Sequence, residues 1–286
     1  MDPSWPRRIQ EVQDHVRAHL RSDLSMEALA RVAGASRFHF ARLFRALTGE
    51  TLVQFVQRAR LERAATLMQT RPDRPLGEVA LQAGFGSASD FSRVFRQHHG
   101  LAPRDWDRRT RLSAGLPDFD DRLSAARETC TRYPVRHVQL PAARLAVVRV
   151  ATPFLDNAVL DEGYARLCRW FASRGIAWRT RALVGLSWDH PDTTPLDRVR
   201  FDLALPLPDG LSTHGEVAEL ALPAMHTVAL RVRGSRACIA VAWERLYTDV
   251  LPHADAEPAD LPALKRFRDQ PWSTGWDTFD LDCQIA

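Results

Sequence analysis

The stretch SASDFSRVFRQHHGLAPRDW, residues 87–106, decides the fold of the first part of the chain, because an upstream stretch repeats its pattern. The two stretches align when Arg93 is set against Arg42, which lies 51 residues earlier. One supersecondary unit is therefore expected to occur twice. The matched positions are Ser36, Phe40, Phe44, Gly49 and Phe55 in the first copy and Ser87, Phe91, Phe95, Gly100 and Trp106 in the second.

Each copy has the start and stop signals of a short helix. Ser36 and Ser87 suit the N-cap position, where a hydroxyl accepts an unpaired backbone N–H two or three residues on. Asp90 completes a pattern like a capping box in the second copy. Gly49 and Gly100 suit the left-handed position that ends a helix. The sequence predicts a helix between each pair of caps.

Each predicted helix has one apolar face and one basic face. The apolar residues recur at helical spacing and are expected to face a core. A further short helix is predicted ahead of each, over residues 26–33 and 76–83. This order is a helix-turn-helix, whose second helix can enter the major groove of DNA. The apolar positions are Phe40, Leu43 and Phe44 in one copy and Phe91, Val94 and Phe95 in the other.

Both copies carry a family resemblance. The run GFGSASDFSRVFRQHHGLAPRDW, residues 84–106, resembles the signature of AraC/XylS-type bacterial transcription regulators. ALARVAGASRFHFARLFRALTGETL, residues 28–52, resembles the upstream half of the same domain. The resemblance covers roughly residues 7–108 and departs at Trp106, where the family usually has Tyr. It implies double-stranded DNA and RNA polymerase as partners.

The resemblance also assigns roles within the two recognition helices. Arg42 and Arg93 are the best candidates for bidentate contacts to guanine. The alternative is that one of them pairs with a nearby carboxylate such as Asp90. Base-edge contacts are expected from Phe38, Ala41, Arg42, Ser89, Ser92 and Arg93, and phosphate contacts from Arg37, Arg45 and Arg96.

The charge of the chain is divided unevenly. Residues 1–110 hold 18 arginines and 12 acidic residues, a net charge of +6, whereas the remainder holds 21 basic and 23 acidic residues, a net of −2. Clustered positive charge favours phosphate binding through counterion release. A solvated helical surface is the alternative reading, but the basic part is also the part with the repeat, so nucleic-acid binding is favoured.

Several classes of protein are not favoured by the sequence. The cysteines are widely separated and form no C-x-x-C pair, so neither zinc nor a disulfide framework is predicted. His39, His98 and His99 lack a further ligand at helical spacing, so no metal or other cofactor is expected. No signal peptide and no apolar run of about 18 residues is present. We therefore expect a soluble, cytoplasmic, nucleoid-associated protein. The cysteines are Cys130, Cys168, Cys238 and Cys283.

Beyond Tyr133 the spacing of apolar residues changes, and it predicts several strands and two helices. The elements are read as a strand, a helix and two strands, taken twice. The predicted fold class is therefore multidomain, with an all-α double helix-turn-helix domain followed by an α+β domain of duplicated strand-helix-strand-strand modules. The expected bounds are 1–110 for the DNA-binding domain, 111–132 for a linker and 133–286 for the α+β domain.

This second domain resembles the GyrI-like effector-binding domain. The resemblance is carried by VGLSWDHPDTTPLDRVRFDLALPL (184–207), AWERLYTDVLP (242–252) and LPALKRFRDQP (261–271). The order of the two domains resembles the Rob type of regulator. It implies a cleft between the two repeats that takes amphipathic or cationic small molecules. Lys265 stands where the family often has an acidic residue, so the charge of the ligand stays open.

The candidates for ligand binding are mainly aromatic, because aromatic faces bind flat or cationic molecules. Each is also a candidate for the core. Glu219 could place a charge near the ligand or point to solvent. The candidates are Trp188, Phe201, Glu219, Trp243, Tyr247 and Trp276.

The predicted function is a sequence-specific DNA-binding transcription regulator controlled by a small amphipathic ligand. In one alternative the second domain recruits protein and senses nothing. In another it is a GyrI-like hydrolase, but no nucleophile with a base and an orienting group is recognisable, so no catalytic residue is assigned. The doubled motif lets one chain occupy two grooves, so a monomer or a homodimer is compatible with the sequence.

Overall fold

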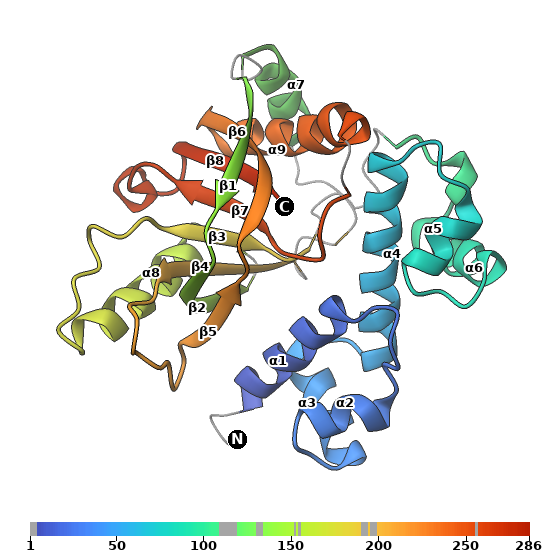
Figure 1. The fold of residues 1–286 in the computed structure, drawn as a ribbon, viewed down its shortest axis with the longest axis horizontal. Coiled ribbons are helices and arrows are strands. Elements are labelled where there is room, and N and C mark those ends of the chain that lie inside the picture. Colours follow the sequence, from blue (N-terminus) through green and yellow to red (C-terminus); the bar gives the residue numbers. More distant parts are fainter. Residues whose placement is uncertain are drawn as a thin grey trace. The chain divides into compact units, whose positions relative to one another are not determined.

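The chain forms two compact units, Met1–Leu112 and Ser113–Ala286. Figure 1 shows their elements in a computed structural model. The predicted linker, residues 111–132, lies partly outside the described residues. The structure describes residues 5–108, 119–129, 134–151, 153, 156–189, 194, 199–254 and 257–286.

The first unit contains the two predicted helix-turn-helix motifs, placed on either side of one long helix, α4. The first motif is α2 and α3, the second is α5 and α6, and α1 packs on the first. The element bounds are α1 Trp5–Ala18, α2 Met26–Val32, α3 Arg37–Thr48, α4 Leu52–Thr70, α5 Leu76–Gln82, α6 Ala88–His99 and a 3-10 turn Pro103–Asp105.

Each motif has its own core, and the repeated phenylalanines form both. In the first core the rings of Phe40 and Phe44 lie 5.7 Å apart, and those of Phe44 and Phe55 lie 5.6 Å apart. In the second, Phe91 and Phe95 lie 5.6 Å apart in the same edge-to-face arrangement. Such pairs add to the free energy of burial. The repeat predicted from sequence is therefore present in the packing.

The predicted helix ends are confirmed in part. Gly49 and Gly100 end α3 and α6 with φ of +74° and +77°. Ser87 accepts a hydrogen bond from the backbone N–H of Asp90 at 3.1 Å. Ser36 occupies the N-cap position, but its side chain makes no cap hydrogen bond. The prediction that the Ser36 hydroxyl accepts a cap hydrogen bond was therefore wrong.

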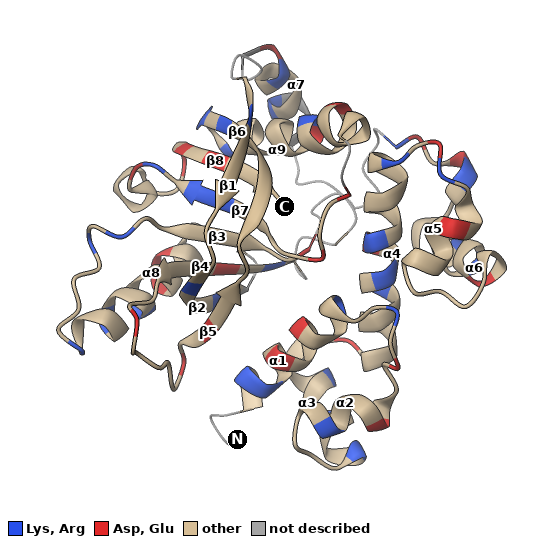
Figure 2. Cartoon of the chain, in the orientation of Figure 1, with Lys and Arg blue, Asp and Glu red and all other residues tan. Residues whose placement is uncertain are grey.

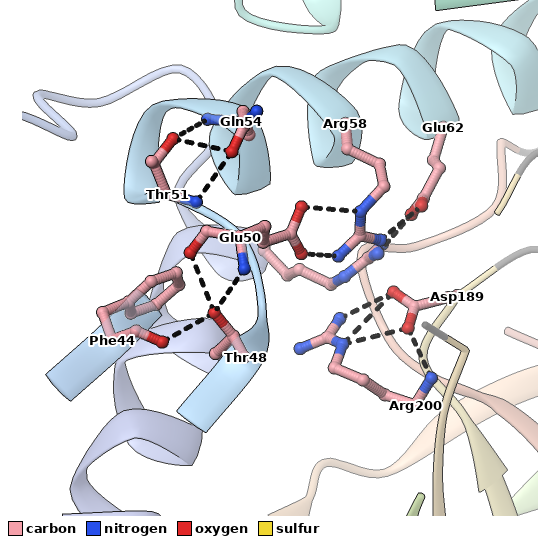
Figure 3. A network of polar contacts seen from close by, with 10 residues as sticks. Phe44, Thr48, Glu50, Thr51, Gln54, Arg58, Glu62, Asp189 and Arg200 are labelled. Carbon is pink, nitrogen blue, oxygen red and sulfur yellow. Dashed lines mark hydrogen bonds and ion pairs between the residues drawn. The ribbon is translucent and has the colours of Figure 1, made fainter. Parts of the chain in front are cut away.

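A full capping box, which the sequence analysis did not identify, starts α4. The backbone N–H of Gln54 donates to the Thr51 hydroxyl at 3.3 Å, and the backbone N–H of Thr51 donates to Gln54 Oε1 at 2.8 Å (Figure 3). The two bonds satisfy backbone donors that a helix start leaves unpaired. They fix the point at which the chain leaves α3 and enters α4.

The second unit is built on one eight-stranded antiparallel sheet with the order β1-β6-β8-β7-β3-β4-β2-β5. The predicted α+β fold class is confirmed. The predicted module had one strand before its helix, whereas each half has two strands, a helix and two strands, and β7 was not among the segments read as strands. The bounds are α7 Phe119–Thr129, β1 Val135–Leu140, β2 Ala143–Ala151, α8 Asn157–Ala172, β3 Val184–Ser187, β4 Arg200–Pro206, β5 Ala218–Leu222, β6 Met225–Gly234, α9 Arg236–Arg245, β7 Ala263–Phe267 and β8 Phe279–Ile285.

The two halves of the sheet exchange their first strands. β1 pairs with β6 of the second half, and β5 pairs with β2 of the first half. β3 and β7 pair at the centre of the sheet. Counted inward from either edge, the corresponding strands of the two halves therefore occur in the same order. The duplication therefore produces one continuous sheet.

The helices cover one face of this sheet. α8 lies on β2 and β4, and α9 lies on β6 and β8 with α7 beside it (Figure 1). Apolar residues of all three helices join those of the sheet in one large core. A smaller apolar cluster, which includes Leu145, Val184 and Leu264, lies on the opposite face. Within the described residues, no helix is both long and apolar enough to cross a membrane.

We predict that Gly84→Ala strongly destabilises the first unit. Gly84 has φ of +91°, and an added Cβ would lie 2.1 Å from the carbonyl oxygen of Leu20. The substitution should lower the unfolding free energy by at least about 2 kcal/mol, as strain at such positions does. Calorimetry of the full chain would measure the loss.

Gly86→Ala is the control, because nothing lies within 4 Å of its added Cβ. It should change the unfolding free energy by less than about 0.5 kcal/mol. Equal effects of the two variants would contradict the assigned close approach.

Candidate nucleic-acid interface and ligand site

The first turn of α3 exposes a large aromatic side chain. Phe38 is 74% exposed, the largest exposed fraction among the exposed large apolar residues of the described chain. The Arg37 guanidinium lies 4.8 Å from the centre of its ring and pairs with Glu27 at 2.8 Å. Folding of the unit does not bury Phe38, so its apolar surface is available to a partner.

Two arginines of α3 follow on the exposed side of the helix. Arg42 and Arg45 are both exposed, and neither makes an ion pair with another residue of the described chain. Ala41 beside them is half-buried. The guanidinium groups therefore keep their donors for an external acceptor, and guanine or phosphate oxygens suit them.

The second recognition helix, α6, presents its arginines differently. Arg93 is 64% exposed and pairs with Asp90, one turn earlier, at 2.6 Å. The sequence analysis gave this pairing as the alternative to a base contact, and the structure shows it. Arg96 and Ser89 are exposed, and Ser92 is half-buried. The pair is solvent-exposed, so it contributes little to stability.

A buried ion network joins α1 to α4 and was not predicted (Figure 3). Arg58 donates to Glu50 at 2.6 Å and to Glu62 at 2.8 Å, and Arg17 also pairs with Glu62. The i,i+4 spacing of Arg58 and Glu62 was the available sequence signal. Removing one partner of such a buried network leaves an uncompensated charge. The network therefore fixes the start of α4 against α1.

In the second unit, three of the aromatic ligand candidates belong to the helix-side core. Phe201, Trp243 and Trp276 are exposed by 4%, 7% and 1%. The indole N–H of Trp276 donates to Asp161 on α8 at 2.7 Å. Trp276 also has φ of +62°, which a non-glycine residue adopts only under strong local constraint. Trp276 therefore holds its loop against α8.

Tyr247 is half-buried and packs against the same core, whereas Trp188 and Glu219 lie elsewhere in the unit. Trp188 donates to Asp202 at 2.6 Å, and Asp202 also accepts two hydrogen bonds from Arg149. Because successive residues of a strand point to opposite faces, Asp202 and its partners lie on the face away from Phe201. Glu219 is paired with Arg144 at 2.7 Å. The structure thus does not bring the six candidates together.

Two residues of the quoted GyrI-like segment form an ion pair. Arg200 donates to Asp189 through its side chain at 2.9 Å and through its backbone N–H at 2.6 Å (Figure 3). Both side chains are buried. The pair joins the residues that follow β3 to the first residue of β4, which is a structural role for these residues of the motif.

The structure adds one aromatic cluster that the sequence analysis did not recognise as such. The ring of Tyr164 on α8 stacks on Trp272 at 3.9 Å and meets Trp178 edge-on at 5.9 Å. Burial raises the pKa of the Tyr164 hydroxyl. Tyr164 and Trp272 lie more than a hundred positions apart in the sequence, so no local sequence pattern could have predicted their contact.

The cysteines also differ from expectation. Cys238 on α9 is disulfide-bonded, although no disulfide framework was predicted. Cys168 and Cys283 are free thiols, and burial raises the pKa of both. No cluster of metal-ligating side chains occurs among the residues that the structure describes.

Comparison with known proteins matches both units. Residues 133–286 match the family described as GyrI-like small molecule binding domain, and residues 29–109 match a helix-turn-helix domain. Regulatory protein SoxS of Escherichia coli (strain K12) is 32% identical over 106 residues, which are 37% of this chain and 98% of SoxS. Transcriptional regulator Rob of Salmonella typhimurium is 31% identical over 96 residues, 34% of this chain and 33% of Rob.

Among solved structures, the DNA-binding domain of AdpA in complex with a target DNA is 33% identical. The match covers 34% of this chain and 86% of that chain, with a TM-score of 0.32.

The fold and these matches define a DNA-binding transcription regulator with a small-molecule-binding domain. The chain belongs to the AraC family of regulators, and its second unit belongs to the GyrI-like family.

We predict that the two recognition helices respond unequally to loss of their N-cap serines. Ser87→Ala removes a cap hydrogen bond and should lower the unfolding free energy by about 1 kcal/mol. Ser36→Ala removes no such bond and should cost clearly less. Calorimetry of the two variants in the full chain would compare them, and equal losses would show that the cap difference is not real.

Proposed function

We propose that α3 and α6 read one DNA site by entering two successive major grooves. The observation that carries this proposal is that Arg42 and Arg93, at matched positions of the repeat, are both exposed on their recognition helices. Two such helices contact one face of a duplex when held about 34 Å apart. One chain therefore suffices for a complete, asymmetric site, and a homodimer is not required.

The roles of individual residues follow from exposure and chemistry. Arg42 is proposed to bind guanine bidentately, and Phe38 to contact a thymine methyl group. Arg93 is proposed to bind guanine while Asp90 holds its guanidinium in place. The remaining base-edge contacts are assigned to Ala41, Ser89 and Ser92, and the phosphate contacts to Arg37, Arg45 and Arg96.

Arg42→Ala and Arg93→Ala should each weaken binding to the specific DNA site by about 1 to 3 kcal/mol and relax base preference at one position. Binding-site selection followed by titration at fixed salt measures both effects. Arg7→Ala is the matched control, because Arg7 is an exposed arginine of α1 outside both recognition helices. If Arg7→Ala changed base preference as much, the assigned readout would be wrong.

Arg45→Ala and Arg96→Ala should weaken binding to specific and non-specific DNA alike. Each phosphate contact releases counterions, so its loss should reduce the slope of log affinity against log salt by about 1. Titrations between low and moderate salt measure that slope. A loss confined to one DNA sequence would instead make these arginines base-reading.

We further propose that the second unit acts as a sensor and not as an enzyme. The hydrolase alternative would need a tyrosine with a glutamate partner, and Glu244 is the nearest glutamate to Tyr247 in sequence. Glu244 accepts two hydrogen bonds from Arg127 of α7, at 3.1 and 2.9 Å. That ion pair supports a role for Glu244 in holding α7 on α9.

The wider setting of the protein is proposed from its class. A regulator of this class is expected to act with RNA polymerase on the nucleoid, in the cytoplasm. A second unit that only recruits protein would bind no small molecule. Ligand control requires that the ligand binds one conformation of the regulator more tightly than another.

A further inference from the structure

The exposed ring of Phe38 lies on the recognition helix α3, on the side away from the core. Phe38 is 74% exposed, whereas Phe40 and Phe44 of the same helix are completely buried. A phenyl ring left in water forgoes the free energy that its burial would give. A partner that covers the ring when α3 enters a groove would therefore gain that free energy.

A guanidinium group fixes the orientation of this ring. The guanidinium carbon of Arg37 lies 4.8 Å from the centre of the Phe38 ring, within range of a cation–π contact. Arg37 Nη1 donates to Oε1 of Glu27 on α2 at 2.8 Å. That hydrogen bond lowers the pKa of the Glu27 carboxyl, so Glu27 is ionised at neutral pH. Glu27 thus holds Arg37 over the ring, and Arg37 has further N–H donors for the phosphate contact proposed above.

Phe38 and Arg42 share one face of α3. They are four residues apart, which places their Cβ atoms about 5 to 6 Å from each other on the helix surface. Both side chains are exposed. This face therefore offers an apolar ring and a bidentate hydrogen-bond donor side by side.

These two groups match two features of base edges in the major groove. The C5-methyl group of thymine is the apolar feature of that groove, and guanine O6 and N7 accept a bidentate pair from arginine. A phenyl ring has no hydrogen-bonding group, so it distinguishes bases by the methyl group. 5-Methylcytosine carries a methyl group at the same ring position as thymine, whereas unmodified cytosine and uracil have only hydrogen there.

The second motif lacks this arrangement. With the offset of 51 residues, Ala88 and Ser89 stand opposite Arg37 and Phe38. α6 therefore presents a small polar side chain where α3 presents a ring held by a guanidinium group. The two halves of one DNA site should consequently differ in their response to a methyl group.

We propose that the first motif reads a 5-methylpyrimidine beside a guanine, so that 5-methylcytosine can replace thymine and cytosine methylation strengthens binding. Phe38 contacts the methyl group and Arg42 binds the guanine. Glu27 is a positioning residue that acts through Arg37. This inference rests on the proposed function of α3 as a recognition helix, and it adds a covalent modification of the DNA to which binding responds.

The test compares bases that differ by one methyl group, with the full chain as the protein. Binding-site selection and Arg42→Ala first identify the guanine that Arg42 reads. The thymine beside it is then replaced by deoxyuridine, and in a second pair of duplexes by cytosine with or without a C5-methyl group. Thymine should bind more tightly than uracil, and methylated more tightly than unmodified cytosine, each by about fourfold, the effect of burying one methyl group. Titrations at fixed salt give both ratios.

Phe38→Ser installs the residue that the second motif has at the matched position. It should bring both ratios to one, and the substitution is on an exposed side chain, so the fold should be kept. Leu81→Ala is the matched control, because Leu81 on α5 is 59% exposed and lies outside both recognition helices. It should leave both ratios unchanged.

The role of Glu27 is tested with the same ratios. Glu27→Ala should lower both, because Arg37 then loses the contact that holds it over the ring. Each ratio compares two duplexes on one protein, so the change in net charge cancels. Glu11→Ala removes a carboxylate from another exposed pair with arginine, on α1, and should leave both ratios unchanged. Equal effects of the two variants would overturn the positioning role.

Failure of the proposed function has a different signature. Footprinting on the selected site should show protection of two successive major grooves, and protection of one groove alone would overturn the proposed function. Two protected grooves with equal binding of thymine and uracil, or of methylated and unmodified cytosine, would overturn the methyl readout alone. The readout would also be wrong if the ratios survived Phe38→Ser, or if deoxyuridine weakened binding equally in the half read by α6.

Discussion

Helix α4 is the element on which both helix-turn-helix cores depend. Its first part packs with α1, α2 and α3, and its second part packs with α5 and α6. At about 1.5 Å per residue a helix of this length spans roughly 28 Å, comparable to the rise of one turn of DNA. The distance between the two recognition helices is therefore set by a continuous hydrogen-bonded rod. The buried pairs of Arg58 with Glu50 and Glu62 hold the first end of that rod.

The sequence predicted the first unit well, because a feature that occurs at matched positions of both copies is supported twice. The left-handed glycines and the phenylalanine positions agree in both copies, and both were confirmed. The side-chain orientation of Ser36 could not be predicted, since residue type allows a cap bond but does not require one. The pair of Arg93 with Asp90 was foreseeable from its i,i+3 spacing, and the sequence left it open against a base contact.

The second unit was predicted less completely, for identifiable physical reasons. β7 was missed because it carries Lys265 and Arg266 at its centre, where the usual alternation would put only one polar residue. Alternation along β4 puts Phe201 and Asp202 on opposite faces, but the sequence does not tell which of the two faces the helices cover, so the ligand candidates could not be sorted by face. Aromatic type alone does not separate core residues from binding residues.

The exchange of first strands bears on how a bound molecule could act. The sheet is continuous through β3 and β7, and its backbone hydrogen bonds resist bending. α8 and α9 contact separate pairs of strands on either side of that centre. A molecule between them would therefore change the spacing of the helices more easily than the shape of the sheet. Since a ligand shifts an equilibrium only by its difference in affinity between two states, a molecule bound between α8 and α9 would act only if it favoured one placement of these helices over another.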